Sequence, residues 1–72
     1  MPQIYEWSKI PIEVNWVATD INKVWGFAVE PGIEGEQWSN PSIPDLPDPI
    51  PLYFLEPYPG NWKKSLEERP TT

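Results

Sequence analysis

The sequence predicts a mostly β fold: a small α+β domain with a three- to four-stranded antiparallel sheet, a proline-rich strap and a short C-terminal helix. Residues 15–30 contain two runs of β-forming residues joined by turn residues. Seven of the eleven prolines lie in residues 40–60, with bulky apolar side chains between them. The 72 residues include no cysteine and no histidine but ten aromatic side chains. These rings must therefore supply the stability that disulfides or metals give other short chains.

The N-terminal segment is apolar but is interrupted by a proline. Ile10, Ile12 and Val14 alternate as in a strand. Pro11 has no N–H group to donate to a neighbouring strand. The segment is therefore either an edge strand or an extended cover over the core.

A central β-hairpin is the clearest element. "NWVAT" (15–19) is predicted to form its first strand and "VWGFAVE" (24–30) its second. "DINK" between them predicts a four-residue loop, in which Asp20 caps the turn and Asn22 accepts a left-handed backbone.

The second strand alternates strictly. Trp25, Phe27 and Val29 share one face, which we predict to be the core face. Gly26, in the middle of this strand, indicates either a bulge or a place where a Trp ring lies flat on the backbone.

A short third strand is predicted at residues 36–39, "EQWS". Pro31-Gly32 and Gly35 mark turns before it. With this strand, residues 1–39 form a β-meander within a single domain, followed by the strap at residues 40–60.

The proline-rich residues 40–60 favour a strap over a disordered tail. Disordered tails lack residues such as Leu52 and Phe54, and prolines reduce the entropy lost when an irregular segment is laid across a core. A polyproline ligand is a poorer match, because "PSIP" and "PDLP" have acidic rather than basic neighbours. Within the strap, residues 50–56 are predicted to form an edge strand.

The C-terminal residues 61–70 predict a short helix. Asn61 is a suitable N-cap for a helix from Trp62 to Arg69, and Pro70 ends it. Two helical turns are unstable alone in water. We therefore expect Trp62 and Leu66 to dock onto the sheet.

The charge is strongly acidic in the middle of the chain. The net charge is −6, and no Lys or Arg lies between Val24 and Trp62. Nucleic acid is an unsuitable partner, because Lys and Arg supply most of the affinity for phosphate. An acidic middle suits a basic protein partner, or it serves solubility alone.

Catalytic and metal chemistry find little support. Without His there is no ordinary base for a serine nucleophile and no ordinary zinc site, so we expect no enzyme, no metal and no cofactor. No run reaches the roughly 18 apolar residues of a membrane span, and the start lacks the regions of a secretory signal. We expect a soluble protein.

Two motifs together resemble a known group of proteins. Trp16-Val17-Ala18-x-Asp20 and the terminal Trp62-x-x-Ser65-Leu66-x-x-Arg69-Pro70 are similar to motifs of small uncharacterised accessory proteins from tailed bacteriophages. The relatives often carry Gly at the turn where this chain has Asn22, and they differ in the long strap. The resemblance implies a phage accessory protein in the cytoplasm of an infected bacterium, where proteins of this size often inhibit host defence.

Two functional hypotheses follow. The first is an inhibitor that covers a basic nucleic-acid-binding surface of a host protein through an acidic, aromatic-rich surface, formed by Trp7, Glu30, Glu34, Glu36, Trp38, Asp45, Asp48 and Tyr58. The second is an oligomeric sponge that stacks a nucleotide immune signal on Trp rings. Its phosphate-binding groups would be Lys63, Lys64 and Arg69, drawn together from several subunits.

The five tryptophans are divided between core and surface in this prediction. Trp16, Trp25 and Trp62 are expected in the core. Trp7 and Trp38 are expected to be exposed, together with Tyr58. The simpler alternative is that all tryptophans are core and that the C-terminal cations only favour a helix end.

Overall fold

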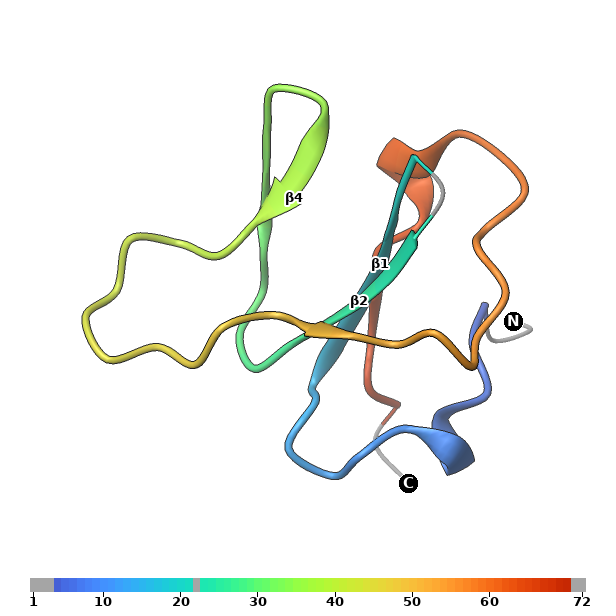
Figure 1. Cartoon of the computed structure of the whole chain (residues 1–72), viewed down its shortest axis with the longest axis horizontal. Helices are drawn as coiled ribbons and strands as arrows, with labels where there is room; N and C mark the ends of the chain where they lie inside the picture. The colour runs from blue at the N-terminus through green and yellow to red at the C-terminus, as the bar shows by residue number, and fades with distance from the viewer. Residues whose placement is uncertain (1–3, 22, 71–72) are drawn as a thin grey trace.

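The computed structural model describes residues 4–21 and 23–70, and these form two antiparallel sheets (Figure 1). The larger sheet has the strand order β5–β2–β1–β6 and consists of β1 (Trp16–Asp20), β2 (Lys23–Phe27), β5 (Ile50–Pro51) and β6 (Glu67–Glu68). The smaller sheet pairs β3 (Gly32–Glu34) with β4 (Gln37–Ser39). Two 3-10 turns, η1 (Trp7–Lys9) and η2 (Trp62–Lys64), complete the described elements. The predicted mostly β fold with a four-stranded antiparallel sheet is confirmed.

The central hairpin forms where the sequence predicts it. β1 and β2 pair over their full length, from Trp16 with Phe27 to Asp20 with Lys23. Asp20 and Lys23 are therefore strand residues, so the predicted four-residue loop is wrong, and β2 ends at Phe27 rather than at residue 30. Ile21 has a φ of 34°, a left-handed backbone that is unusual for a β-branched residue. Asn22, expected to adopt such a backbone, lies outside the described residues.

The main apolar cluster lies on the opposite face of β2 from the one predicted to be core. Val24 is 3% exposed and belongs to the main apolar cluster, whereas Trp25 and Val29 are half-buried. Phe27 is buried, but it lies on the same face as Trp25, away from this cluster. The prediction is therefore confirmed for Phe27 and wrong for Trp25 and Val29, because it ranked the faces by side-chain size. The N-terminal segment and the strap both cover the face with the smaller residues.

Gly26 explains why that face is covered. A Cβ atom at this position would lie 2.9 Å from Val14 Cγ1 and 3.3 Å from Leu52 Cδ1. Gly26 therefore marks a close approach of side chains to the backbone, and neither predicted alternative, a bulge or a flat Trp ring, is found among the described residues around it. The side chains are aliphatic rather than an indole ring.

The N-terminal segment is a cover rather than an edge strand. It lies against one side of the larger sheet, while the β3–β4 hairpin lies on the other (Figure 1). Ile10 and Val14 are buried in the main cluster, and Ile12 is 80% exposed. The Val14 N–H donates to the Pro11 carbonyl at 3.0 Å. This local turn takes the place of strand pairing.

The strap crosses the edge of the larger sheet from the hairpin side to the N-terminal side (Figure 1). Its strand β5 is an edge strand, as predicted, but it covers two residues rather than seven. Leu52 is the strap's fully covered apolar side chain, at 1% exposed, whereas Tyr53 and Phe54 are 78% and 56% exposed. The strap is therefore attached mainly through β5 and Leu52.

The C-terminal segment begins as a helix but continues as a strand. Asn61 caps η2, and its Oδ1 accepts a hydrogen bond from the Lys63 N–H at 3.1 Å. The turn ends at Ser65, whose Oγ lies 2.8 Å from the Thr19 nitrogen, which donates to it. Residues Glu67–Glu68 then pair with β1. The predicted helix from Trp62 to Arg69 is wrong beyond Lys64, because the unpaired edge of β1 offers backbone bonds to this segment.

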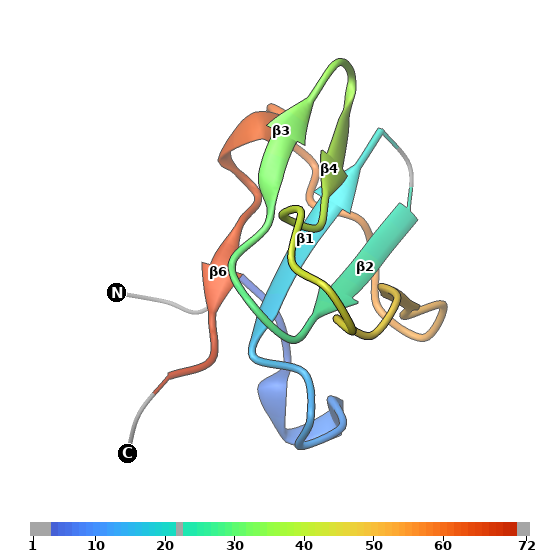
Figure 2. The same ribbon diagram turned by 90° about the vertical axis from the view of Figure 1, so that its left-hand side faces the viewer.

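The predicted third strand exists at Gln37–Ser39 but does not join the larger sheet. It pairs with β3, which the sequence interpretation had treated as turn residues. Gly35 has a φ of +66° at the first position of the two-residue turn, where a type II′ hairpin requires glycine. Figure 2 shows the hairpin lying over the end of β1.

Candidate functional site

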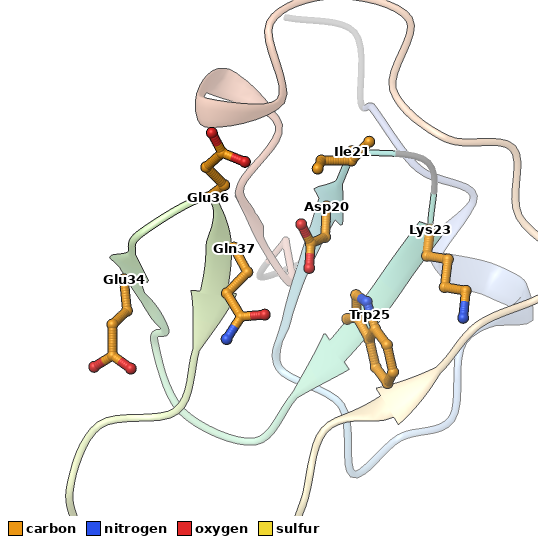
Figure 3. Close-up of a pocket in the computed structure, with 7 residues that line it drawn as sticks. All are labelled: Asp20, Ile21, Lys23, Trp25, Glu34, Glu36 and Gln37. Atoms are coloured by element: carbon orange, nitrogen blue, oxygen red, sulfur yellow. The ribbon is translucent and has the colours of Figure 1, made fainter.

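Two hairpins enclose an open groove on the hairpin side of the larger sheet (Figure 3). We call it the interhairpin groove. Its volume is about 650 Å³, and it is lined by Asp20, Ile21, Lys23, Trp25, Glu34, Glu36 and Gln37. The lining contains three carboxylates, those of Asp20, Glu34 and Glu36, and one ammonium group, that of Lys23.

The β1–β2 hairpin supplies the floor of the groove. Ala18 pairs with Trp25 and Asp20 pairs with Lys23, so Asp20 and Trp25 share the face that looks toward the smaller sheet. Figure 3 shows the Lys23 side chain directed away from Asp20. Burial raises the pKa of the Asp20 carboxyl above its ordinary value, because a partly desolvated carboxylate is a less stable anion.

The β3–β4 hairpin supplies the other wall. The amide of Gln37 is directed into the groove, and Glu36 lies at the tip of the hairpin (Figure 3). Glu34 is directed outward from the rim in the same view. Both glutamates are exposed, as the proposed acidic surface requires.

The other predicted acidic residues are exposed but more scattered. Glu30 and Glu34 line a second hollow beside Pro31. Asp48 lines a third hollow together with Trp38. Asp45 lies in the strap with a φ of 63°, a backbone that Asp tolerates better than most residues. Of the predicted acidic residues, Glu34 and Glu36 therefore line the interhairpin groove, whereas Glu30, Asp45 and Asp48 lie outside its lining.

Trp7 is a correction to the predicted surface. It is 5% exposed and belongs to the main cluster. Its indole Nε1 donates to Glu67 Oε1 at 2.7 Å, and the Arg69 guanidinium lies 4.9 Å from the ring centroid. Both partners lie about sixty residues away in the sequence, so no local pattern indicates them. Trp7 holds the two ends of the chain together and is not available to a partner.

Trp38 and Tyr58 are half-buried rather than fully exposed. Trp38 Nε1 donates to the carbonyls of Thr19 and Trp62, at 3.1 and 3.3 Å. The Tyr58 N–H donates to Thr19 Oγ1 at 2.9 Å. Both residues are attached to Thr19, and only part of each ring faces solvent.

Trp16, Trp25 and Trp62, expected in the core, are half-buried. Trp25 matters most here because its ring lines the interhairpin groove. The sequence interpretation missed Asp20, Ile21, Trp25 and Gln37 as surface residues. The strand alternation contained the signal, since residues 20 and 25 share a face once the register is known, but that face had been assigned to the core.

The three cations of the sponge hypothesis are not equivalent. Lys63 and Lys64 lie exposed on η2, and the Lys63 ammonium lies 5.7 Å from the Trp62 ring centroid. The Arg69 guanidinium instead donates to the carbonyls of Val14 and Pro11, at 2.8 and 2.6 Å. Arg69 therefore secures the N-terminal cover and has little capacity left for a phosphate.

Buried hydroxyl groups in the molecule serve the fold. Tyr5, Thr19 and Ser65 form a connected network in which the Tyr5 hydroxyl lies 2.8 Å from Thr19 Oγ1 and donates to the Ser65 carbonyl at 2.8 Å. Such a network lacks a base and an open approach. Among residues 4–21 and 23–70, no group of three or more metal-ligating side chains lies together.

The described part of the chain includes no helix with the length and apolar character that crossing a membrane requires. No family model, curated protein or solved structure matches the sequence. The resemblance to phage accessory proteins therefore stays a prediction, and a function has to be argued from the geometry.

Proposed function

We propose that this chain is a non-enzymatic, phage-type accessory protein that inhibits a host protein by binding its basic surface. The observation that carries the proposal is the interhairpin groove, whose lining combines the half-buried Trp25 ring with the carboxylates of Asp20, Glu34 and Glu36. Protein interfaces favour aromatic anchors at their centre. Complementary charge around such an anchor steers the partner and excludes wrong ones.

The distribution of charge supports a basic partner. The hairpin β3–β4 and the strap contain acidic residues but no Lys or Arg. The side of the molecule that contains the groove therefore presents mainly negative charge to a partner, with Lys23 as the one cation among the described residues of the groove lining. Basic surfaces that bind nucleic acid are the natural complement, because they already accept a phosphate chain.

The cellular role rests on the resemblance of the two end motifs to phage proteins. It implies action in the cytoplasm of an infected bacterium, with a defence protein as the target. The nucleotide-sponge alternative has less support, because Arg69 is engaged with backbone carbonyls of the N-terminal cover.

Affinity capture from a bacterial lysate tests the proposal. The full chain is immobilised and retained proteins are identified, with bound small molecules analysed alongside. We expect a basic host protein that is retained at low salt and released at high salt, since salt screens exposed charges. The double variant Glu34→Lys/Glu36→Lys should lose this protein.

A matched control separates the groove from net charge. The double variant Glu13→Lys/Glu56→Lys makes the same charge change at two exposed residues outside the groove. It should retain the host protein. The proposal is wrong if both double variants lose it equally, or if wild type retains no basic protein.

A further inference from the structure

The β3–β4 hairpin lies on one face of the larger sheet. Beyond β4, the end of this face is left uncovered. Trp25 and Asp20 are neighbours on this face, and Figure 3 shows both directed toward the open space between the hairpins. Two other indole rings of this chain are contacted by its own cations. The Trp7 and Trp62 rings each lie under a cation, Arg69 and Lys63 respectively.

Trp25 differs from these two rings. Among the residues described, no cation of the chain lies over it. Asp20 beside it makes no ion pair within the same residues, where Lys9 with Glu6 is the one pair found. Among these residues, the groove thus combines an indole face without a cation and a partly desolvated carboxylate that makes no ion pair, because its cross-strand neighbour Lys23 is directed away from it (Figure 3). The indole face and the carboxylate both attract a cation with N–H donors.

We propose that the groove accepts an arginine side chain from an exposed loop of the partner, with its guanidinium stacked on Trp25 and hydrogen-bonded to Asp20. This inference rests on the proposed function and specifies its partner. Arginine suits the site better than lysine, because a planar guanidinium stacks on a ring while its N–H groups still reach a carboxylate. The chain itself holds Arg69 over Trp7 in this manner, with its N–H groups on oxygen acceptors.

The rim of the interhairpin groove suits a second basic residue from the same loop of the partner. Glu36 at the hairpin tip and Glu34 on the outer side extend the negative charge beyond Asp20. Exposed ion pairs at a rim contribute little each. The arginine at Trp25 should therefore dominate the affinity.

The test is an NMR titration of the full-length protein, labelled with ¹⁵N, by three capped pentapeptides of sequence Gly-Ser-X-Ser-Gly. X is arginine, lysine or citrulline, which keeps the shape of arginine without its charge. We expect the arginine peptide to shift the Trp25 indole N–H and the Gln37 signals most. Lysine should shift them less, and citrulline least.

Variants locate the binding. Asp20→Asn and Trp25→Leu should each weaken the arginine peptide about two- to five-fold. Glu56→Gln, with the same charge change as Asp20→Asn but outside the groove, should leave it unchanged. Backbone spectra confirm that each variant is folded. Equal shifts from arginine and citrulline, or equal weakening by Asp20→Asn and Glu56→Gln, would overturn the inference.

The two proposals fail separately. A host protein released by Glu34→Lys/Glu36→Lys, together with no arginine-specific shift at Trp25, would overturn the arginine site and leave the binding function standing. Arginine-specific shifts at Trp25 without a captured basic protein would support the site and overturn the proposed function.

Discussion

Single residues decide how closely the layers of this molecule approach. Gly26 lets Val14 and Leu52 rest on the backbone of β2. Thr19, which is fully buried, has the opposite role and joins segments through hydrogen bonds. Its side-chain oxygen contacts the Tyr5 hydroxyl and accepts from the Tyr58 N–H, so the N-terminal cover and the strap meet at one atom.

Gly26→Ala should destabilise the protein. The added methyl group would lie 2.9 and 3.0 Å from the two methyl groups of Val14, and overpacking of this kind costs about 1–3 kcal/mol. Gly32→Ala is the matched control, because nothing lies within 4 Å of its Cβ position. Urea unfolding followed by Trp fluorescence measures both. Equal midpoints for the two variants would show that the contact at Gly26 is unimportant.

At the scale of elements, the C-terminal segment fastens the N-terminal cover. The Glu67 carboxylate accepts hydrogen bonds from the N–H groups of Ile4 and Tyr5 and from the Trp7 indole. Arg69 holds the turn before β1 through carbonyl oxygens. The two ends of the chain therefore stabilise each other.

Arg69→Met should loosen this attachment. Methionine keeps much of the side-chain volume but loses the charged hydrogen bonds to Val14 and Pro11, at a cost of about 2 kcal/mol. Lys64→Met removes the same charge at an exposed position and should change the unfolding free energy little. Hydrogen exchange should reveal faster exchange at residues 5–14 in Arg69→Met. Unchanged exchange there would mean that Arg69 is not a fastener.

The β3–β4 hairpin is attached by fewer contacts. Its main link is Trp38, whose indole bonds to two carbonyls and packs edge-on against Trp62, with ring centroids 6.3 Å apart. A hairpin of two short strands is marginal by itself. The groove wall that contains Gln37 therefore depends on this single ring for its position.

At the scale of the whole molecule, aromatic rings hold a chain without disulfides together from both sides of one sheet. Tyr5 and Trp7 lie in the cluster on the N-terminal side, and Phe27 is buried on the hairpin side. The stability of the fold should therefore depend on pH through a titratable group in the core. Burial raises the pKa of the Tyr5 hydroxyl, against the opposing effect of its hydrogen bonds to Thr19 and Ser65.

The sign of this response is a loss of stability in alkali. Above the unfolded pKa of 10.0, the unfolded chain releases the Tyr5 proton while the folded chain keeps it, so unfolding becomes more favourable as pH rises. Urea midpoints from pH 8 to 11.5 should fall in wild type. Tyr5→Phe, though less stable at pH 8, should fall less steeply, whereas Tyr53→Phe at an exposed position should follow wild type. Parallel curves for all three would contradict the assignment.

The candidate site was only partly predictable. Glu34 and Glu36 were predicted from charge alone, because no Lys or Arg lies between Val24 and Trp62. Asp20 and Trp25 were not, since their role depends on which face of β2 is covered. Trp7 was wrongly predicted to be exposed. Its burial depends on a hydrogen bond to Glu67, which is distant in sequence.

The sequence by itself determined the central hairpin, the edge position of the strap strand and the cap at Asn61, because local backbone preferences decide these features. Only the tertiary structure decided which face of β2 became core and that Glu67–Glu68 became a strand rather than a helix. These choices depend on free sheet edges and on contacts between segments far apart in the chain. Residue propensities do not determine these two features, because the contacts that stabilise them form only when the distant segments come together.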